Sequence, residues 1–441
     1  MEKQLKIWLF PVLIILLTAC STKKQQVFQP DGTELKKCTD EMTKLMLHDV
    51  TNPPLASRFY AYAFLAGYEV LAQHDTAFHG MAGILNEYPK IPQPVISAYS
   101  YQLAAVLAIL ETAGKMQPSG KLLAEKRKII IDSCLKNGMN ENVVKGSEEY
   151  AGQIAKEILK YAKKDGYFKI SDYPRYTPEK GEGYWFPTPP AFFGAIEPYF
   201  NKVRPFTLDS ASVFKPVPPA EYSAEKGSRF FKLMEEVRIT GVSLSHEQKN
   251  IAAFWDCNPF AMQDEGHLQI GVKKISPGGH WMGIAGIACQ QKKLDFNKSL
   301  QIHTVLAITL MDAFITCWDE KYRSNRIRPE AAIRKLTDPE WKPMLQTPPF
   351  PEYLSGHSVI STASAEVLSQ FLGDSVAYAD NVEVPYGLAP RKFQSFRQAA
   401  EEAAISRLYG GIHFSDAIQN GQIQGKKVGG NVIKKLKLKR I

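Results

Sequence analysis

Hydrophobic side chains recur along most of the chain at the three- and four-residue spacing of an amphipathic α-helix. Runs of strict alternation between apolar and polar residues are scarce, so we expect strands to be absent or minor. The pattern therefore predicts an all-α protein built from helical bundles. The clearest predicted helices span residues 97–115, 120–136, 141–164, 246–256, 297–320, 358–372, 396–409 and 422–436.

Two of these helices have readable starts. Ser245 followed by Gln248 has the spacing of a capping box, in which each residue satisfies a backbone N–H group of the other. Asn140 stands where an N-cap residue is expected, just before the helix at 141–164.

Between residues 166 and 223 the helical pattern gives way to a stretch rich in proline and aromatic rings. Proline at this density breaks helices, so we expect a long ordered loop between an N-terminal and a C-terminal half. Loops of this length in compact proteins are often functional. Aromatic rings that merely pack over a seam between two bundles explain the composition equally well.

The first nineteen residues predict the signal peptide of a lipoprotein. Lys3 and Lys6 are followed by an apolar run up to Ala19, which is too short to span the core of a bilayer. The small residues ahead of Cys20 resemble a bacterial lipobox, in which the cysteine is acylated. We expect lipidation at Cys20, export, and anchoring to a bacterial membrane. Ser21 favours the outer membrane, with the protein facing the periplasm or the cell surface.

These features predict five consecutive parts. They are a signal peptide (1–19), a tether (20–34), an N-terminal helical part (35–165), the proline- and aromatic-rich loop (166–223) and a C-terminal helical part (224–441).

The composition agrees with a globular protein. Of the 441 residues, 44% are hydrophobic and 22% are charged, and the formal net charge is +9. Several of the positive charges lie in the last eight residues. In an exported, anchored protein this basic tail meets anionic lipid or solvent rather than nucleic acid. Cys289 and Cys317 lie in apolar helical runs and are expected to be buried thiols.

Candidate chemistry concentrates in three short segments. "WDEKYRSNRIRP" supplies Lys321 and Arg328, "PPFPEYLSGHS" supplies Ser355 to His357, and "SRLYGGIHFSD" supplies Arg407 and His413. Taken alone, the basic residues of the first segment are typical of a solvated face, and His413 is typical of an ordinary packed histidine. The Ser-Gly-His segment at a predicted helix start favours an anion, because free N–H groups and the helix dipole point there.

Taken together, the three segments offer cations, a hydroxyl, glycine N–H groups and two imidazoles. Arginine and lysine offset the charge of an oxyanion, and the forked donors of arginine fix its orientation. We therefore expect a cage for one small tetrahedral oxyanion.

The pattern K-x6-R-P, then SGH, then S-R-x5-H resembles the superfamily of vanadium-dependent haloperoxidases and type 2 phosphatidic acid phosphatases. The three blocks occur in order between about residues 290 and 430, and residues 53–71 look like an N-terminal helix of the bacterial haloperoxidase branch. The resemblance implies that Lys321, Arg328 and Arg407 neutralise the oxyanion. It also implies that Ser355 and Gly356 add hydrogen bonds, that His357 is the acid–base and that His413 is the apical group.

This resemblance leaves three functions open. In a vanadate-dependent haloperoxidase, His413 would coordinate vanadium, and the metal would act as a Lewis acid that prepares peroxide for attack by halide. In a phosphatase of lipid or small phosphate esters, which needs no cofactor, His413 would attack phosphorus to give a phosphohistidine. The third reading is a non-catalytic anion-binding lipoprotein. Association into a homo-oligomer stays open in all three.

Two aromatic residues favour the haloperoxidase. At the positions of Trp318 and Phe350, the resemblance to the chloroperoxidase-like branch implies an aromatic wall on the halide side of the site. Both residues fit equally well as core aromatics. The resemblance also implies that Asp256 hydrogen-bonds Arg407. Two departures from the family pattern are Leu354, where proline is usual, and Asp416, which follows His413 by three residues rather than four. Of the other histidines, His280 beside Trp281 is the one expected near a pocket.

Overall fold

The computed structural model describes residues 30–189, 192–265, 268–271 and 274–441. In these ranges it has thirteen α-helices, three short 3-10 helices and two small antiparallel sheets of two strands each. The predicted all-α class is therefore confirmed. The sheets pair β1 (Met262–Glu265) with β2 (Leu268–Gly271), and β3 (Tyr378–Asp380) with β4 (Arg391–Phe393).

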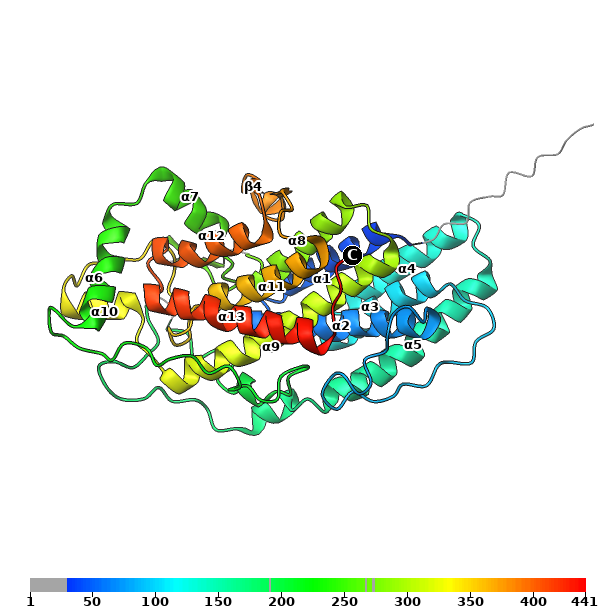
Figure 1. Ribbon diagram of the computed structural model, residues 1–441, viewed down its shortest axis with the longest axis horizontal. Helices are drawn as coiled ribbons and strands as arrows, with labels where there is room; N and C mark the ends of the chain where they lie inside the picture. Colours follow the sequence, from blue (N-terminus) through cyan, green and yellow to red (C-terminus); the bar gives the residue numbers. More distant parts are fainter. Residues whose placement is uncertain (1–29, 190–191, 266–267, 272–273) are drawn as a thin grey trace, which may run out of the picture.

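The helices of the N-terminal half gather toward one end of an elongated molecule (Figure 1). They are α1 (Gly32–His48), α2 (Pro53–His74), α3 (Tyr101–Met116), α4 (Lys121–Lys136) and α5 (Glu141–Lys163). Asp31 caps α1, so this helix begins inside the predicted tether, whose limit at residue 34 is too late. The signal peptide and Cys20 lie outside the described residues.

The C-terminal half contributes eight helices. They are α6 (Arg229–Val242), α7 (His246–Phe254), α8 (Pro277–Gln291), α9 (Phe296–Ser324), α10 (Pro329–Leu336), α11 (Gly356–Leu372), α12 (Phe396–Tyr409) and α13 (Ser415–Lys435). The capping box predicted at Ser245 and Gln248 is present at the start of α7, and Asn140 caps α5.

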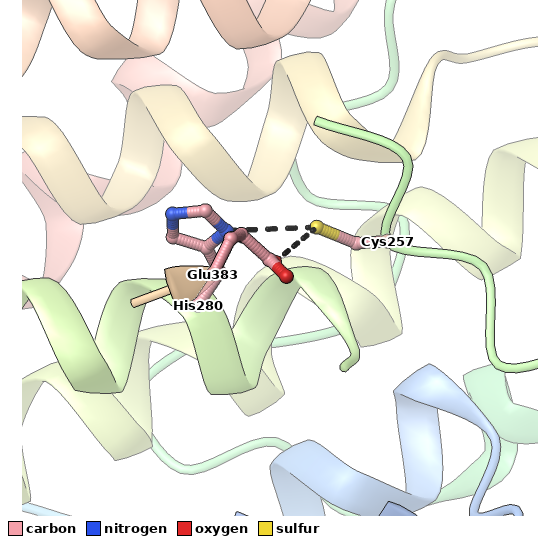
Figure 2. A group of neighbouring side chains, drawn as sticks. All are labelled: Cys257, His280 and Glu383. Atoms are coloured by element: carbon pink, nitrogen blue, oxygen red, sulfur yellow. Dashed lines mark hydrogen bonds and ion pairs between the residues drawn. The ribbon is translucent and has the colours of Figure 1, made fainter. Parts of the chain in front are cut away.

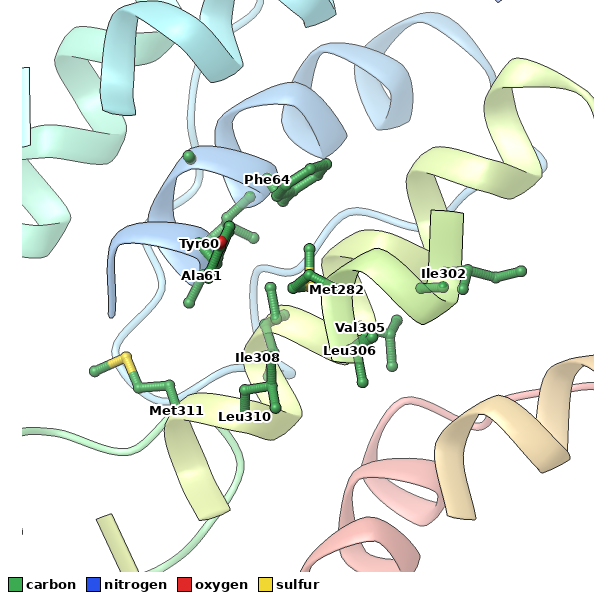
Figure 3. Packing of buried hydrophobic residues seen from close by; sticks show 14 of the residues in the cluster. Tyr60, Ala61, Phe64, Met282, Ile302, Val305, Leu306, Ile308, Leu310 and Met311 are labelled. Atoms are coloured by element: carbon green, nitrogen blue, oxygen red, sulfur yellow. The ribbon is translucent and has the colours of Figure 1, made fainter. Parts of the chain in front are cut away.

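Helix α9 runs through the centre of the molecule. It packs against α1, α2, α8, α11 and α13, and its residues from Leu300 to Lys321 are buried except for Gln301. By length and mean hydropathy it passes the test for a membrane span, but 94% of that window is buried inside the protein. Figure 3 shows its apolar side chains packed with those of α2 and α8. The largest cluster of buried hydrophobic side chains spans both halves, and two smaller clusters lie in the C-terminal half.

The segment 166–223 is mostly irregular, as predicted, and contains only the 3-10 helices η1 (Tyr167–Asp172) and η2 (Phe200–Lys202) among its described residues. It packs on α9 through hydrogen bonds from Trp318 Nε1 and Tyr322 Oη to the carbonyl oxygen of Ile196, at 3.1 and 2.6 Å. The loop thus fixes the face of α9 that carries the predicted site.

A row of glycines lets α11 and α13 approach closely. A Cβ atom on Gly425 would lie 2.4 Å from the carbonyl oxygen of Val359, and one on Gly421 would lie 2.8 Å from the Cβ of Ser358. Residues four apart share one face of a helix, so these glycines form a groove for the backbone of α11. The groove holds the N-terminal part of α11 against α13.

Candidate functional site

The three predicted segments meet in the folded chain. Lys321 lies in the last turn of α9, Arg328 caps α10, and Arg407 lies in the last turn of α12. Arg328 joins the segments directly, because its Nε donates to the carbonyl oxygen of Phe350 at 2.8 Å and its Nη1 to that of Ile412 at 2.9 Å.

A small cavity of about 40 Å³ lies where the segments meet. One water molecule needs roughly 10 to 15 Å³ by the same kind of measure, so the cavity holds a group of a few atoms. Its size suits one tetrahedral oxyanion. The predicted residues that line it are Trp318, Phe350, Gly356, His357, Arg407 and His413. Lys321, Arg328 and Ser355 stand behind this wall.

Four buried polar atoms at or next to the cavity are left without a hydrogen-bond partner in the described part of the chain. Three belong to lining residues, Nε of Arg407, Nε2 of His357 and Nδ2 of Asn258, and the fourth is Nη2 of Arg328, whose Nη1 contacts the lining residue His413. An unpaired buried polar group is costly, so their convergence indicates a missing polar ligand. Gly356 leaves the cavity open at the start of α11, because the nearest atom to a Cβ there would be 3.9 Å away, on Trp318.

The electrostatics of the site favour an anion. Burial lowers the pKa of Lys321 to about 7 and that of Arg328 to about 9. Burial also lowers the pKa of His413 well below its ordinary value, and the charges of Arg328 and Lys321 add to this effect. The two imidazoles are therefore held neutral among cations whose charge nothing in the cavity offsets.

The ammonium group of Lys321 is hydrogen-bonded to backbone carbonyl groups and does not line the cavity. Its Nζ donates to the carbonyl oxygens of Pro351, Glu352 and Leu354 at 3.0, 3.1 and 2.5 Å. The side chain thus fixes the loop before α11 and adds positive charge at the back of the site. Leu354, which departs from the family pattern, supplies one of these carbonyl groups.

His413 is oriented by Glu352, which the sequence analysis did not single out. Its Nδ1 lies 2.8 Å from Oε1 of Glu352, and its Nε2 lies 3.2 Å from Nη1 of Arg328. The Glu352 carboxylate accepts a hydrogen bond from the Nδ1–H group, so Nε2 is the unprotonated nitrogen, and its lone pair, which faces Nη1 of Arg328, is the one that could bind a metal. Asp416 does not take this part: it binds Arg326 through both oxygens, at 2.8 and 2.7 Å.

Arg326 connects these two carboxylates, since its Nε also donates to Oε2 of Glu352 at 2.6 Å. The sequence suggested only that Arg326 belongs to a solvated basic face, but the residue is buried, with an exposed fraction of 3%. Glu352 stands three residues before Ser355, inside the second segment. An acidic residue so close to the Ser-Gly-His sequence was the feature that could have pointed to a partner for His413.

The carbonyl oxygen of Trp255 positions two residues of the site. Arg407 Nη1 donates to it at 2.7 Å, and the ring of His357 is also hydrogen-bonded to it. The predicted hydrogen bond from Asp256 to Arg407 is not formed, because Asp256 forms an ion pair with Lys274. Its negative charge still acts on Arg407, opposing the fall in pKa that burial causes.

Trp318 and Phe350 form an aromatic wall of the cavity, with ring centroids 5.0 Å apart. Both rings therefore line the cavity, and both also pack in or against the largest hydrophobic cluster. Ser355 caps α11 by accepting hydrogen bonds from the backbone N–H and the hydroxyl of Ser358, at 3.3 and 2.8 Å.

Known proteins share this architecture. The family described as the VCPO second helical-bundle domain matches residues 301–439. A solved structure described as the first bacterial vanadium-dependent iodoperoxidase is 44% identical, with a TM-score of 0.86, and the match covers 92% of this chain and 97% of that chain. None of the curated proteins matches.

Two structures of bacterial vanadium-dependent chloroperoxidase, a holo and an apo form, share the fold at lower identity. They are 15% and 14% identical, with TM-scores of 0.65 and 0.61. Each match covers 88% of this chain, and 93% and 95% of the other chains.

Helical bundles with unpaired buried polar groups around a cavity of the size of one tetrahedral oxyanion are typical of enzymes that bind such an ion. With a 44% identical relative across nearly its whole length, the chain belongs to the bacterial vanadium-dependent haloperoxidase family. It is an oxidoreductase whose cofactor is vanadate, and the resemblance stated from the sequence is confirmed.

Proposed function

We propose that this protein oxidises iodide with peroxide at a vanadate bound between His357, Arg407 and His413. The observation that carries the proposal is the set of unpaired buried atoms on Arg407 and His357, which line one small cavity, and on Arg328, which contacts the lining residue His413. Iodide is proposed as the halide because the relative with 44% identity is described as an iodoperoxidase.

Each cage residue has a separate part in this reaction. Arg328 and Arg407 hold the oxygens of the anion with their free N–H groups, and Lys321 adds charge from behind the wall. His413 would hold vanadate through Nε2, because Glu352 holds the proton on Nδ1. His357 is the acid–base, since its Nε2 is unpaired and its ring is fixed by the carbonyl of Trp255. Bound vanadate supplies the Lewis acid that polarises a peroxide oxygen toward the halide.

The aromatic wall fits the halide side. Trp318 and Phe350 present apolar surface to the cavity, and a halide that reaches it gives up part of its hydration. A large, weakly hydrated halide such as iodide gives up less than a small one.

The test is a halide oxidation assay with the full chain purified in a buffer free of phosphate. We expect the rate of iodide oxidation by peroxide to depend on added vanadate and to saturate at one vanadate per chain. His413→Ala should abolish it, whereas His246→Ala, at an exposed histidine on α7, should not. Vanadate-independent oxidation, or full activity of His413→Ala, would contradict the proposal. Hydrolysis of p-nitrophenyl phosphate, measured beside it, tests the phosphatase alternative.

We also propose that the protein is a lipoprotein anchored through Cys20. The support is the sequence alone: Lys3 and Lys6, the apolar run up to Ala19 and the small residues before Cys20. In a bacterial host fed labelled palmitate, the full chain should carry label and sediment with membranes, and Cys20→Ala should do neither. Labelling that survives this change would contradict the proposal.

A further inference from the structure

A second group of side chains lies beside the oxyanion cavity and has no part in the proposed reaction. Cys257 follows α7 and lines the cavity, His280 lies in α8, and Glu383 precedes a short 3-10 helix at 384–386 (Figure 2). All three are buried, with exposed fractions of 3%, 0% and 6%. Three segments far apart in the sequence thus bring a thiol, an imidazole and a carboxylate to one place.

The distances between the potential ligand atoms fit one metal ion. Nδ1 of His280 lies 3.7 Å from Sγ of Cys257 and 3.1 Å from Oε1 of Glu383, and Sγ lies 4.0 Å from Oε1. Zinc bond lengths of about 2.0 to 2.3 Å in a tetrahedral arrangement require ligand atoms roughly 3.3 to 3.6 Å apart. Adjustments of a few tenths of an ångström therefore place all three atoms on one ion.

The surroundings of His280 are those of a metal-bound imidazole. Its Nε2 lies 2.8 Å from Oδ2 of Asp380, which fixes the ring and leaves Nδ1 to face the other two groups. A carboxylate behind the distal nitrogen of a histidine ligand is a regular feature of zinc sites. The ring is held flat against Trp255, with centroids 4.6 Å apart.

The donor set selects the kind of ion. A thiolate is a soft ligand, and imidazole and carboxylate are accepted by the same borderline ions, so Zn²⁺ fits better than Mg²⁺ or Ca²⁺. Thiolate and carboxylate together balance the two charges of the ion. Binding releases the thiol proton of Cys257 and any proton on Nδ1 of His280.

We propose that Cys257, His280 and Glu383 form a buried Zn²⁺ site with three protein ligands and one position left for water. The ion would brace the segment that begins at Trp255, whose carbonyl group holds Arg407. The site adjoins the vanadate cavity, because Cys257 lines both, but it uses none of the residues proposed to hold vanadate.

The test measures metal rather than activity. The full chain, purified without chelators and given Zn²⁺, should retain about one zinc per chain by elemental analysis. With Co²⁺ in its place, a thiolate-to-cobalt charge-transfer band should appear. Cys257→Ser should remove the band, and Cys134→Ser, at a buried cysteine of α4, should keep it. Asp380→Asn should weaken binding about 10- to 100-fold.

Two further variants keep the proposal open to refutation if Cys257→Ser fails to fold. Glu383→Gln and His280→Asn, each checked for a native circular dichroism spectrum, should also lose the zinc. Wild-type protein that retains no zinc would overturn the proposal. So would folded variants that bind zinc as wild type does, or zinc that is lost in His413→Ala and kept in Cys257→Ser.

Discussion

At the scale of single residues, Glu352 decides which nitrogen of His413 carries the proton. Its Oε1 accepts from Nδ1 of His413 and from the backbone N–H of Phe414, at 2.8 and 3.0 Å. Both contacts orient the imidazole, whose Nε2 then faces Nη1 of Arg328 at the lining of the cavity. The carboxylate is itself held by Arg326, so the orientation rests on a buried network rather than on one contact.

Replacing Glu352 should therefore weaken vanadate binding without touching the anion. We expect Glu352→Gln to lower the affinity for vanadate about 10- to 100-fold, as loss of the partner behind a metal-bound histidine usually does. Isothermal titration calorimetry measures the change. Glu247→Gln, at an exposed glutamate, is the matched control and should bind as wild type does. Unchanged affinity in a folded Glu352→Gln would show that His413 needs no such partner.

Lys321 gives the site a pH dependence. Burial lowers its pKa to about 7, and the charge of Arg328 contributes. An anion favours the protonated ammonium, so above about pH 7 the protein must take up a proton to bind, and binding weakens as pH rises by up to about tenfold per unit. Below that pH the ammonium is already protonated, and the effect disappears.

Lys321→Met isolates this contribution, since vanadate has its own titration that cancels in a ratio. The ratio of wild-type to Lys321→Met affinity should be constant below about pH 7 and should fall above it. Lys335→Met, at an exposed lysine paired with Glu182, should leave the ratio at one at every pH. A ratio for Lys321→Met that does not change with pH would exclude a titrating Lys321.

The residues of the cage were predictable because the motif carries them. Lys321, Arg328, His357, Arg407 and His413 lie in three segments that meet in the fold, as the resemblance to the haloperoxidase and phosphatase superfamily implied. The groups that position them were not predictable in the same way. The carbonyl oxygen of Trp255 has no signature in the sequence, and the ion pair of Asp256 with Lys274 depends on how two distant segments pack.

At the scale of helices, the contact between α11 and α13 fixes the geometry of the site. The glycine row on α13 brings its backbone against that of α11, which begins with Ser355 to His357. Any side chain in that row must push the helices apart, because the atoms it would meet are backbone atoms of α11 or Cβ atoms attached to that backbone, and these cannot move alone.

Gly425→Ala should thus be destabilising. We expect a loss of about 1 to 3 kcal/mol in the free energy of unfolding, as for overpacking elsewhere, together with weaker vanadate binding. Gly430→Ala is the control on the same helix, because a Cβ there meets nothing within 4 Å. It should be neutral or stabilising by about 0.5 to 1 kcal/mol. Denaturant unfolding measures both, and equal stability of the two variants would contradict the close approach.

The hydrophobic pattern predicted eight of the thirteen helices of the described residues, and it missed α1, α2, α6, α8 and α10, although residues 53–71 were noted for their resemblance to a helix of the haloperoxidase branch. The central helix was expected at 297–320 and ends only at Ser324, where Asn325 takes a left-handed conformation with φ of 47°. Helix α8 was not predicted, because four glycines weaken its pattern, and burial on nearly all sides removes the periodicity. Helix α10 is too short, at eight residues, to show a period.

At the scale of the whole molecule, the two halves share one core. The largest cluster of buried side chains includes residues of α1 and of α13, whereas those of α6 and α10 form a smaller cluster, and α9 contacts helices of both halves. The predicted boundaries at residues 165 and 223 therefore mark changes in amino-acid composition. They do not separate two hydrophobic cores.

We expect the protein to unfold as one unit, including the half that does not touch vanadate. At a hundred times its dissociation constant, vanadate should add about 2.7 kcal/mol to the free energy of unfolding. Hydrogen exchange in the slowest amides of α2 and α3 should then slow together with that in α11. His413→Ala should remove the effect everywhere. Protection confined to the C-terminal half would indicate two independent folding units.

The unpaired donors around the cavity have a practical consequence for anyone who handles this protein. Guanidinium and imidazole groups recognise oxygen atoms and their charge, and phosphate presents the same tetrahedron of oxygens as vanadate. Orthophosphate in a growth medium or chromatography buffer would compete with vanadate for the same cavity and keep the cofactor out. The share of active molecules in a preparation would then reflect the supply of two rival ions as much as the quality of the fold.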